Sequence, residues 1–226
     1  MKKTIIALGI ALCCNALHAQ TTIINEGIEI RLPDVNNEAD QKLLQQRAKE
    51  CVKQMNDYIT SMTAKQINGH PTLSDRFKFR KAALELFLNN GDSIELNNGI
   101  KGAPVMMETT SVNASGKSIK TTRPIKVYFE RLINLIQKGT YTDVTITSTD
   151  IEAMDVSKMQ KVGDRYQCVV SYSQDFIGRR GEITTYADRT KKTITVWFVT
   201  EKTIWGEELV PKLGDIAAGE TKRIYK

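Results

Sequence analysis

The chain has 226 residues, with 32 lysines and arginines against 26 aspartates and glutamates, and a formal net charge of +6 at pH 7. This length fits one large domain. The basic residues are interspersed with acidic ones and do not form the basic, aromatic-rich face of a nucleic-acid binding protein, so we expect no nucleic-acid partner.

The N-terminus has the pattern of an export signal. Lys2 and Lys3 precede an apolar run from Thr4 to Cys14, and the small residue Ala19 follows shortly afterwards. This order is typical of a signal peptide cleaved after Ala19. The apolar run is too short to cross a bilayer, which takes about 20 residues, and no later segment resembles a transmembrane helix.

The predicted signal sets the expected domain organisation. We expect a cleaved signal peptide at 1–19, an N-terminal extension at 20–39 and a single domain at 40–226. The mature protein is expected in the periplasm or outside the cell. Lipid attachment at Cys13 or Cys14 is the less favoured alternative, because a lipobox cysteine follows a small residue and Cys13 follows Leu12.

Three segments have the apolar spacing of amphipathic helices. The first spans about 40–62. The second begins near Ser74 as its N-cap and ends at Asn89-Asn90-Gly91, and the third opens at Pro124 and ends at Gly139. The apolar side of the second helix is expected to carry Phe77, Leu84, Phe87 and Leu88.

Between the second and third helices the sequence predicts a short strand at 93–96, a two-residue turn at Asn98-Gly99 and a returning strand at 104–113. A polar, mobile loop is expected at 114–120. From Thr142 onward, apolar and polar residues alternate with a period of two, which is typical of strands with one buried face. The expected strands start near Val144, Tyr166, Ile194 and Glu208, with a protruding hairpin or loop at Gly178 to Arg189.

This order of elements predicts an α+β fold. Three helices would pack in the concave face of a curved antiparallel sheet, as in a cone-shaped or cystatin-like roll. The Asn98-Gly99 hairpin, the helix at Arg123-Pro124 and the strand Lys212 to Ile216 resemble the nuclear transport factor 2-like superfamily.

The segments 106–113, 124–135 and 188–192 more narrowly resemble exported members of that superfamily from Bacteroides-type bacteria. The superfamily contains isomerases, dehydratases, carriers and non-catalytic modules. The resemblance therefore implies the fold and leaves the activity open.

The mature chain retains few residues for nucleophilic or metal chemistry. Cys51 and Cys168 either form a disulfide between the first helix and the sheet or remain two buried thiols. Neither cysteine has a metal ligand at short spacing, so we expect no metal. His70 is the mature chain's single histidine and lies in a turn. We therefore assign no catalytic residue and expect no cofactor.

Four tyrosines are predicted near the interior of the cone, where they either pack in the core or line a ligand pocket: Tyr58, Tyr128, Tyr166 and Tyr172. Three aspartates lie on or beside the strands: Asp150, Asp155 and Asp175. Ketosteroid isomerase, which the superfamily resembles in fold, combines an aspartate base with a tyrosine in an apolar pocket. In the predicted strands, none of these aspartates clearly points into the interior on the same face as a tyrosine.

Two surfaces are further candidates for binding. The first is an arm that either is solvated or binds anionic glycans or lipid headgroups, and it carries Arg179, Arg180, Arg189 and Lys191. The second is the outer face of the strand at 193–199, where Trp197 and Val199 are more apolar than an open face requires. We expect a homodimer through this face, although another partner or the N-terminal segment are alternatives.

These observations favour an exported, non-enzymatic module that binds a small apolar ligand or an envelope protein. The alternative is an isomerase or dehydratase that uses tyrosine and aspartate. An enzyme of this kind needs a carboxylate inside the cone with a raised pKa, whereas a binding module needs only shape.

Overall fold

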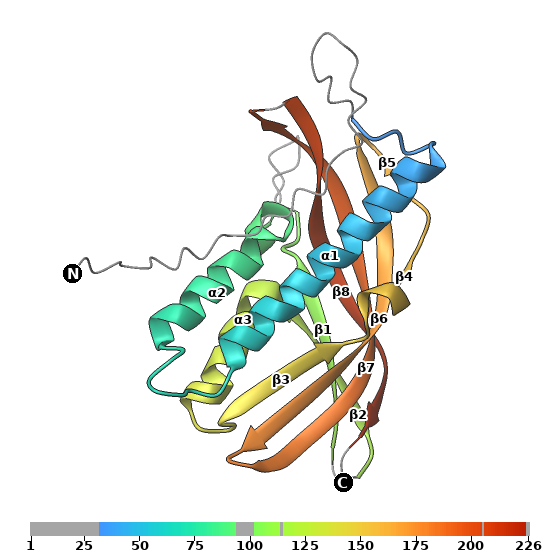
Figure 1. Cartoon of the computed structure of the whole chain (residues 1–226). Coiled ribbons are helices and arrows are strands. Elements are labelled where there is room, and N and C mark those ends of the chain that lie inside the picture. The colour runs from blue at the N-terminus through green and yellow to red at the C-terminus, as the bar shows by residue number, and fades with distance from the viewer. Residues whose placement is uncertain (1–31, 94–101, 114, 205, 225–226) are drawn as a thin grey trace, which may run out of the picture.

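The computed structural model describes residues 32–93, 102–113, 115–204 and 206–224. It contains three α-helices and one eight-stranded mixed sheet, which confirms the α+β class. Figure 1 shows the helices together on one side of the curved sheet. The helices are α1 (Glu38–Thr63), α2 (Leu73–Glu85) and α3 (Ile125–Gln137), with short 3₁₀ turns η1 (Leu88–Gly91) and η2 (Ile151–Ala153).

The strands follow the order β2-β1-β8-β7-β6-β3, and the short strands β4 and β5 pair with β6. Their bounds are β1 Met106–Val112, β2 Ser118–Pro124, β3 Asp143–Ser148, β4 Asp155–Val156, β5 Gln160–Val162, β6 Arg165–Arg180, β7 Ile183–Thr203 and β8 Gly206–Arg223. The sheet is open, because β2 and β3 form its two edges.

The sheet is mixed, so the expectation of a wholly antiparallel sheet was wrong at one place. Met107 of β1 and Ile216 of β8 are partners in a parallel pairing. Only strands joined by a tight turn must be antiparallel. β1 and β8 are the first and last strands, and most of the domain separates them along the chain.

The helix starts are fixed by capping side chains. Asn37 caps α1 by accepting from the backbone of Ala39 and Asp40. Thr72, and not Ser74, caps α2: its hydroxyl accepts from Asp75 N, and the Asp75 carboxylate accepts from Thr72 N. This reciprocal capping box satisfies two backbone donors at once.

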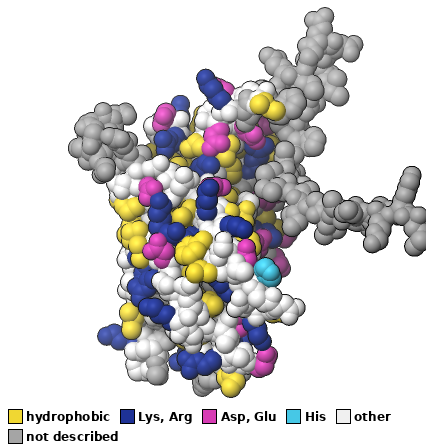
Figure 2. Space-filling model, turned by 90° about the vertical axis from the view of Figure 1, so that its left-hand side faces the viewer, with side chains coloured by type: hydrophobic (Ala, Val, Ile, Leu, Met, Phe, Trp, Pro, Cys, Tyr) yellow, Lys and Arg dark blue, Asp and Glu magenta, His cyan; other side chains and the backbone are white. Residues whose placement is uncertain are grey.

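The second helix and the turn after it bury most of the side expected, since Leu84, Phe87 and Leu88 are at most 8% exposed, but Phe77 is 45% exposed and the expectation was wrong for this residue. Ala83 also faces the core, and Phe79 packs partly against it. Figure 2 shows the side of the molecule that carries α2 and α3, where hydrophobic side chains lie singly among charged ones. Isolated exposed apolar residues of this kind are common on soluble domains.

One segment expected as a loop belongs to a strand, and one expected as a hairpin or loop is a hairpin. β2 begins at Ser118, inside the segment expected as a mobile loop, and pairs with β1 from Val112↔Ser118 onward. The segment Gly178 to Arg189 is the tip of the β6–β7 hairpin, because both strands continue into it. The expected strand at 93–96 and turn at Asn98-Gly99 fall on 94–101, outside the described residues.

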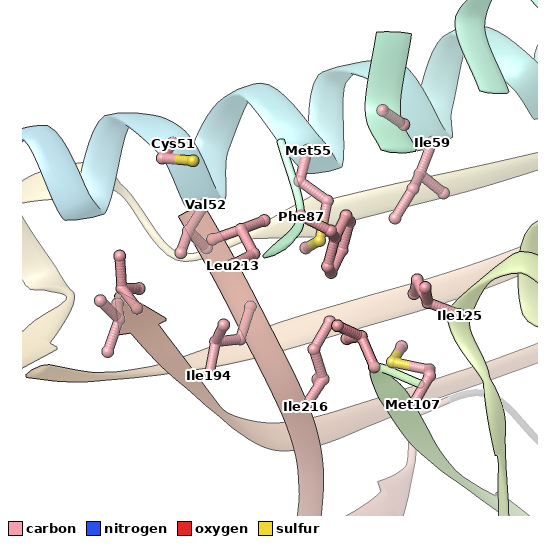
Figure 3. Close-up of a cluster of buried hydrophobic side chains, with 14 of the residues drawn as sticks. Cys51, Val52, Met55, Ile59, Phe87, Met107, Ile125, Ile194, Leu213 and Ile216 are labelled. Carbon is pink, nitrogen blue, oxygen red and sulfur yellow. The ribbon is translucent and has the colours of Figure 1, made fainter. Parts of the chain in front are cut away.

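The core lies between α1 and the sheet. In Figure 3, Val52 of α1 lies next to Leu213 of β8, and Ile59 of α1 points toward Ile125 at the start of α3. α3 seals the other side with a stripe of buried residues, namely Ile125, Phe129, Leu132 and Ile133. Among the described residues, no helix has the length and hydropathy needed to cross a membrane.

Both cysteines of the described chain are buried, free thiols, so the structure contains the second of the two alternatives and not the disulfide. The Cys51 thiol lies 3.9 Å from the Pro211 carbonyl oxygen. Burial raises the pKa of both Cys51 and Cys168 to about 12. Neither thiol is therefore primed for nucleophilic attack near neutral pH.

Candidate ligand pocket

The candidate site is a cavity of about 450 Å³ between α3 and strands β1, β2, β6 and β7. This volume lies within the range of small-molecule sites. Strand geometry explains why one strand dominates the lining: alternate residues of β7 point to the same face, which brings four side chains toward α3. They are Tyr186, Asp188, Thr190 and Lys192.

Asp188 and Tyr186 form the inner end of the pocket. Asp188 is only 5% exposed, and its carboxylate accepts a short hydrogen bond from the Tyr186 hydroxyl. The same hydroxyl oxygen accepts from Val112 N at 3.0 Å. Burial raises the pKa of Asp188, against the opposing effects of the Tyr186 hydrogen bond and the Lys192 charge. At any given pH the protonated form of Asp188 is therefore more populated than that of an exposed aspartate.

Lys192 lies at the same end and is 4% exposed. Its ammonium donates to the backbone carbonyl of Glu108 at 2.7 Å. Burial lowers the pKa of Lys192 to about 8, although the charges of Asp188 and Glu108 act in the opposite direction. The pocket therefore contains an acid and an amine that both titrate closer to neutrality than usual.

Two arginines lie at the outer end. Arg123 of β2 is half-buried and Arg131 of α3 is exposed. Burial and then the neighbouring charge of Arg131 lower the pKa of Arg123. Among the described residues, neither guanidinium has a hydrogen-bond or ion-pair partner. Two close cations without a carboxylate repel each other, and a bound anion would relieve that repulsion.

Between the two ends the walls combine aromatic and leucine side chains with the hydroxyl groups of β1 and β2. Phe176 makes edge-to-face contacts with Tyr141 and Tyr186, with ring centroids 6.1 and 6.0 Å apart. Leu132 of α3 lies opposite these rings. The buried Thr110 hydroxyl has no hydrogen-bond partner among the described residues. The pocket thus combines an apolar middle with one unsatisfied polar group.

Two other hollows are less suitable. One of about 750 Å³ lies beside Ser93, at the edge of the described chain, and its Lys212 is already paired with Glu201 at 3.2 Å. Another of about 590 Å³ lies beside α1, where Lys53 and Asp57 pair at 2.7 Å. The described residues contain no group of three or more His, Cys, Asp or Glu side chains that could hold a metal ion.

Of the four tyrosines expected at the site, Tyr128 lines the pocket. Tyr172 is buried in the core, and its pKa is raised by burial and then by the nearby Tyr128 phenol, whose own pKa is also raised by burial. Tyr58 lies on α1, where its hydroxyl accepts from Gln54 at 3.3 Å. Tyr166 pairs with Phe198 across β6 and β7. The structure therefore does not bring the four together.

The basic residues of the hairpin are mostly engaged by the protein itself. Arg179 donates to Asp143 at 3.1 Å, and Arg180 donates to the carbonyl of Thr140 at 3.4 Å. Arg189 forms a bidentate pair with Asp175, with both distances 2.7 Å. Asp175, one of the three candidate aspartates, is therefore already engaged in an ion pair. Lys191 is exposed.

The other predicted residues lie away from the pocket. Asp150 and Asp155 are exposed next to η2. His70 is exposed between α1 and α2, with its Nδ1 3.3 Å from Asp75 Oδ2. On the outer face of the sheet, Trp197 packs over Gly214, where an added Cβ would lie 2.9 Å from the indole nitrogen. Part of its apolar surface is therefore covered by β8, and the homodimer stays a prediction.

The key pocket residues Asp188, Lys192, Arg123 and Arg131 were not singled out from the sequence. A usable signal was present, because the alternation that places Trp197 and Val199 on the outer face makes Val196 and Ile194 face inward. Continuing that period of two toward the N-terminus reaches Lys192 and Asp188. Because the segment Gly178 to Arg189 is expected as a hairpin or loop, the strand pattern was not continued through it to these residues.

Comparisons with known proteins add little to this geometry. No protein-family model matches the chain, and the comparison with curated proteins finds no match. Among solved structures, the chain is similar to a phenazine biosynthesis-related protein from Pseudomonas aeruginosa, with 13% sequence identity and a TM-score of 0.26. The match covers 79% of this chain and 86% of that chain. A likeness at this TM-score carries no argument about function.

Proposed function

We propose that this protein is an exported binding module whose pocket holds a small organic anion with an apolar body. The observation that carries the proposal is the pair Arg123 and Arg131, two neighbouring guanidinium groups at the pocket's outer end without a carboxylate partner among the described residues. Guanidinium groups bind carboxylates and related anions through paired, charge-assisted hydrogen bonds.

The rest of the lining supports the same class of ligand. The rings of Phe176 and Tyr141 and the side chain of Leu132 supply an apolar contact surface of the size of an aryl or short alkyl group. The unpaired Thr110 hydroxyl would then pair with a polar substituent in the middle of the pocket, and the Asp188–Tyr186 pair would select for one at the inner end. Polar groups placed around an apolar contact surface are typical of sites that orient a ligand.

Isothermal titration calorimetry tests this proposal with matched pairs of acid and amide, such as 4-phenylbutyrate with its amide and octanoate with its amide. We expect the acids to bind at least tenfold more tightly than the amides. Arg123→Gln should remove most of that difference, because a hydrogen bond to a charged group contributes about 1.5–3 kcal/mol. Arg165→Gln, an arginine outside the pocket, is the matched control. Equal affinities for acids and amides would contradict the proposal.

A second function is favoured by one specific observation, the buried Asp188 with its raised pKa beside the Tyr186 phenol. We propose as the alternative that the pocket is the site of an isomerase or dehydratase, with Asp188 moving a proton at carbon and Tyr186 or Lys192 polarising a carbonyl. Asp188 takes the place of Asp150, Asp155 and Asp175 as the candidate base.

Proton exchange distinguishes the alternative from binding alone. The probe is 4-phenyl-2-oxobutyrate in deuterated buffer, and the measurement is loss of its α-proton signal in NMR spectra. An enzyme should accelerate exchange, and Asp188→Asn should reduce the acceleration by at least about 100-fold, since general-base catalysis contributes about 10²–10⁴-fold. Asp155→Asn serves as the control. Exchange at the buffer rate with the wild-type protein would reject the enzymatic reading.

A further inference from the structure

We propose that Lys192 is a nucleophile that forms an imine with an aldehyde or ketone bound in the pocket. The proposal rests on the proposed function only in requiring that a small molecule enters this cavity. It assigns the substrate class, a carbonyl compound, and a covalent step that the binding proposal does not contain.

The placement of Lys192 carries the inference. Other lysines of the domain, such as Lys53, Lys120 and Lys126, sit in ion pairs with carboxylates at 2.5–2.7 Å. Lys192 is buried at the inner end of a cavity, and its hydrogen bond goes to the neutral carbonyl oxygen of Glu108. No carboxylate of the described chain forms an ion pair with Lys192. Its ammonium group can therefore lose a proton without breaking an ion pair.

The charges that surround Lys192 come from several elements. Asp188 on β7 and Glu108 on β1 favour its ammonium form, whereas burial and Lys120 on β2 favour the amine. Burial has the largest effect and brings the pKa to about 8. At pH 8 about half of Lys192 is then the free amine, compared with roughly 0.4% of an exposed lysine whose pKa is about 10.4. Desolvated lysines of this kind serve as amine nucleophiles.

The reaction balances with the groups present. The lone pair of the Lys192 amine forms a bond to the carbonyl carbon, and one nitrogen proton moves through the Asp188 carboxylate to the carbonyl oxygen to give a carbinolamine. The carbon–oxygen bond then breaks, Asp188 carries the second nitrogen proton to the departing hydroxyl so that it leaves as water, and a carbon–nitrogen double bond remains. One water is released for each imine formed, and no electrons are transferred. The raised pKa of Asp188 suits it to deliver that proton.

Reductive trapping tests the proposal. The full mature protein is incubated at pH 7.5 with 4-formylbenzoate and sodium cyanoborohydride, which converts the imine to a stable secondary amine, and labelled lysines are located by fragment-ion mass spectrometry. We expect Lys192 to be labelled at least tenfold faster than the exposed Lys81. Labelling of Lys192 at or below the rate of Lys81 would overturn the proposal, and the wild-type protein alone suffices for this comparison.

Two variants sharpen the result. Lys192→Arg should abolish the fast label, whereas Lys81→Arg should leave it unchanged. Asp188→Asn should slow the labelling of Lys192 without affecting Lys81. A fast label that persists in Lys192→Arg would show that another amine is responsible and would overturn the proposal.

The outcome also separates this proposal from the one on which it rests. If calorimetry shows that carboxylic acids bind, but Lys192 is not labelled by 4-formylbenzoate, the imine proposal fails and the binding proposal stands. If Lys192 is labelled equally fast by 4-formylbenzoate and by neutral benzaldehyde, and 4-phenylbutyrate does not slow it, the amine is reactive but the anion site is refuted.

Discussion

Replacing Lys192 by methionine should stabilise the protein near neutral pH. In the folded state the ammonium loses its proton near pH 8 because it is buried, whereas in the unfolded chain it does so near pH 10.4. At pH 7 the charged form of Lys192 is therefore less favourable in the folded protein than in the unfolded chain, which lowers the stability of the fold. Methionine is similar in length, has no charge and packs well in irregular cores.

The size of the effect follows from the difference between the two pKa values. A shift of about 2.5 units corresponds to about 3 kcal/mol of destabilisation at pH 7. The substitution also leaves the Glu108 carbonyl without its donor and Asp188 without a nearby positive charge, which costs about 1–2 kcal/mol. We therefore expect Lys192→Met to raise the free energy of unfolding by about 1–2 kcal/mol at pH 7.

The pH dependence has a defined sign. Between pH 8 and pH 10.4 the unfolded state binds the proton that the folded state has lost, so the wild-type protein gains stability relative to Lys192→Met as pH rises. By pH 10 the wild type should recover about 2.5 kcal/mol, and the variant should become the less stable protein. Urea unfolding at pH 7 and pH 10 measures both values, with Lys81→Met as an exposed control. A difference between variant and wild type that is the same at both pH values would refute this reasoning.

Two predictions concern the framework that positions the pocket. Arg76 of α2 is 4% exposed and donates to the carbonyls of Met62 and Ala64 at the end of α1. Arg76→Ala should lower the free energy of unfolding in urea by about 3 kcal/mol, since it leaves buried carbonyls unpaired, and a loss below about 1 kcal/mol would contradict that role. Leu213→Ala removes a fully buried side chain beneath α1 and should cost about 3 kcal/mol, whereas Val127→Ala on the exposed side of α3 should change stability by less than about 0.5 kcal/mol. Similar losses for these two would argue against the observed core.

The sequence was sufficient to predict the fold class and most helices and strands whose apolar residues recur at a regular spacing. The apolar spacing over 40–62 predicts an amphipathic helix, and the residues at that spacing, such as Leu44, Cys51 and Ile59, are buried in α1. The alternation in β6 and β7 likewise gave the buried face. These features depend on local spacing, which a single sequence displays directly.

The parts that failed depend on contacts between distant segments. Nothing local in 106–113 shows that β1 pairs in parallel with β8, because the partner lies more than a hundred residues away. The β2 strand is exposed and polar at most positions. It therefore lacks the alternation of apolar and polar residues from which a strand can be predicted. Its strand character comes from pairing with β1 and not from its own composition.

The pocket was missed for a related reason. Asp188 and Lys192 occupy inward positions of a strand, where charged residues are rare, and the sequence alone favours a solvated loop for such a stretch. Only the register with β6 and the packing of α3 place them around a cavity. Arg123 and Arg131 come from β2 and α3, and their proximity is visible only in the folded chain.

A crystal structure of the protein with a bromine-substituted aryl carboxylate, such as 4-(4-bromophenyl)butyrate, tests the central claim most directly. The account predicts anomalous bromine density inside the cavity between α3 and β7, with the carboxylate within hydrogen-bond distance of Arg123 or Arg131. Bromine density elsewhere at saturating ligand, or a carboxylate turned away from both arginines, would contradict it.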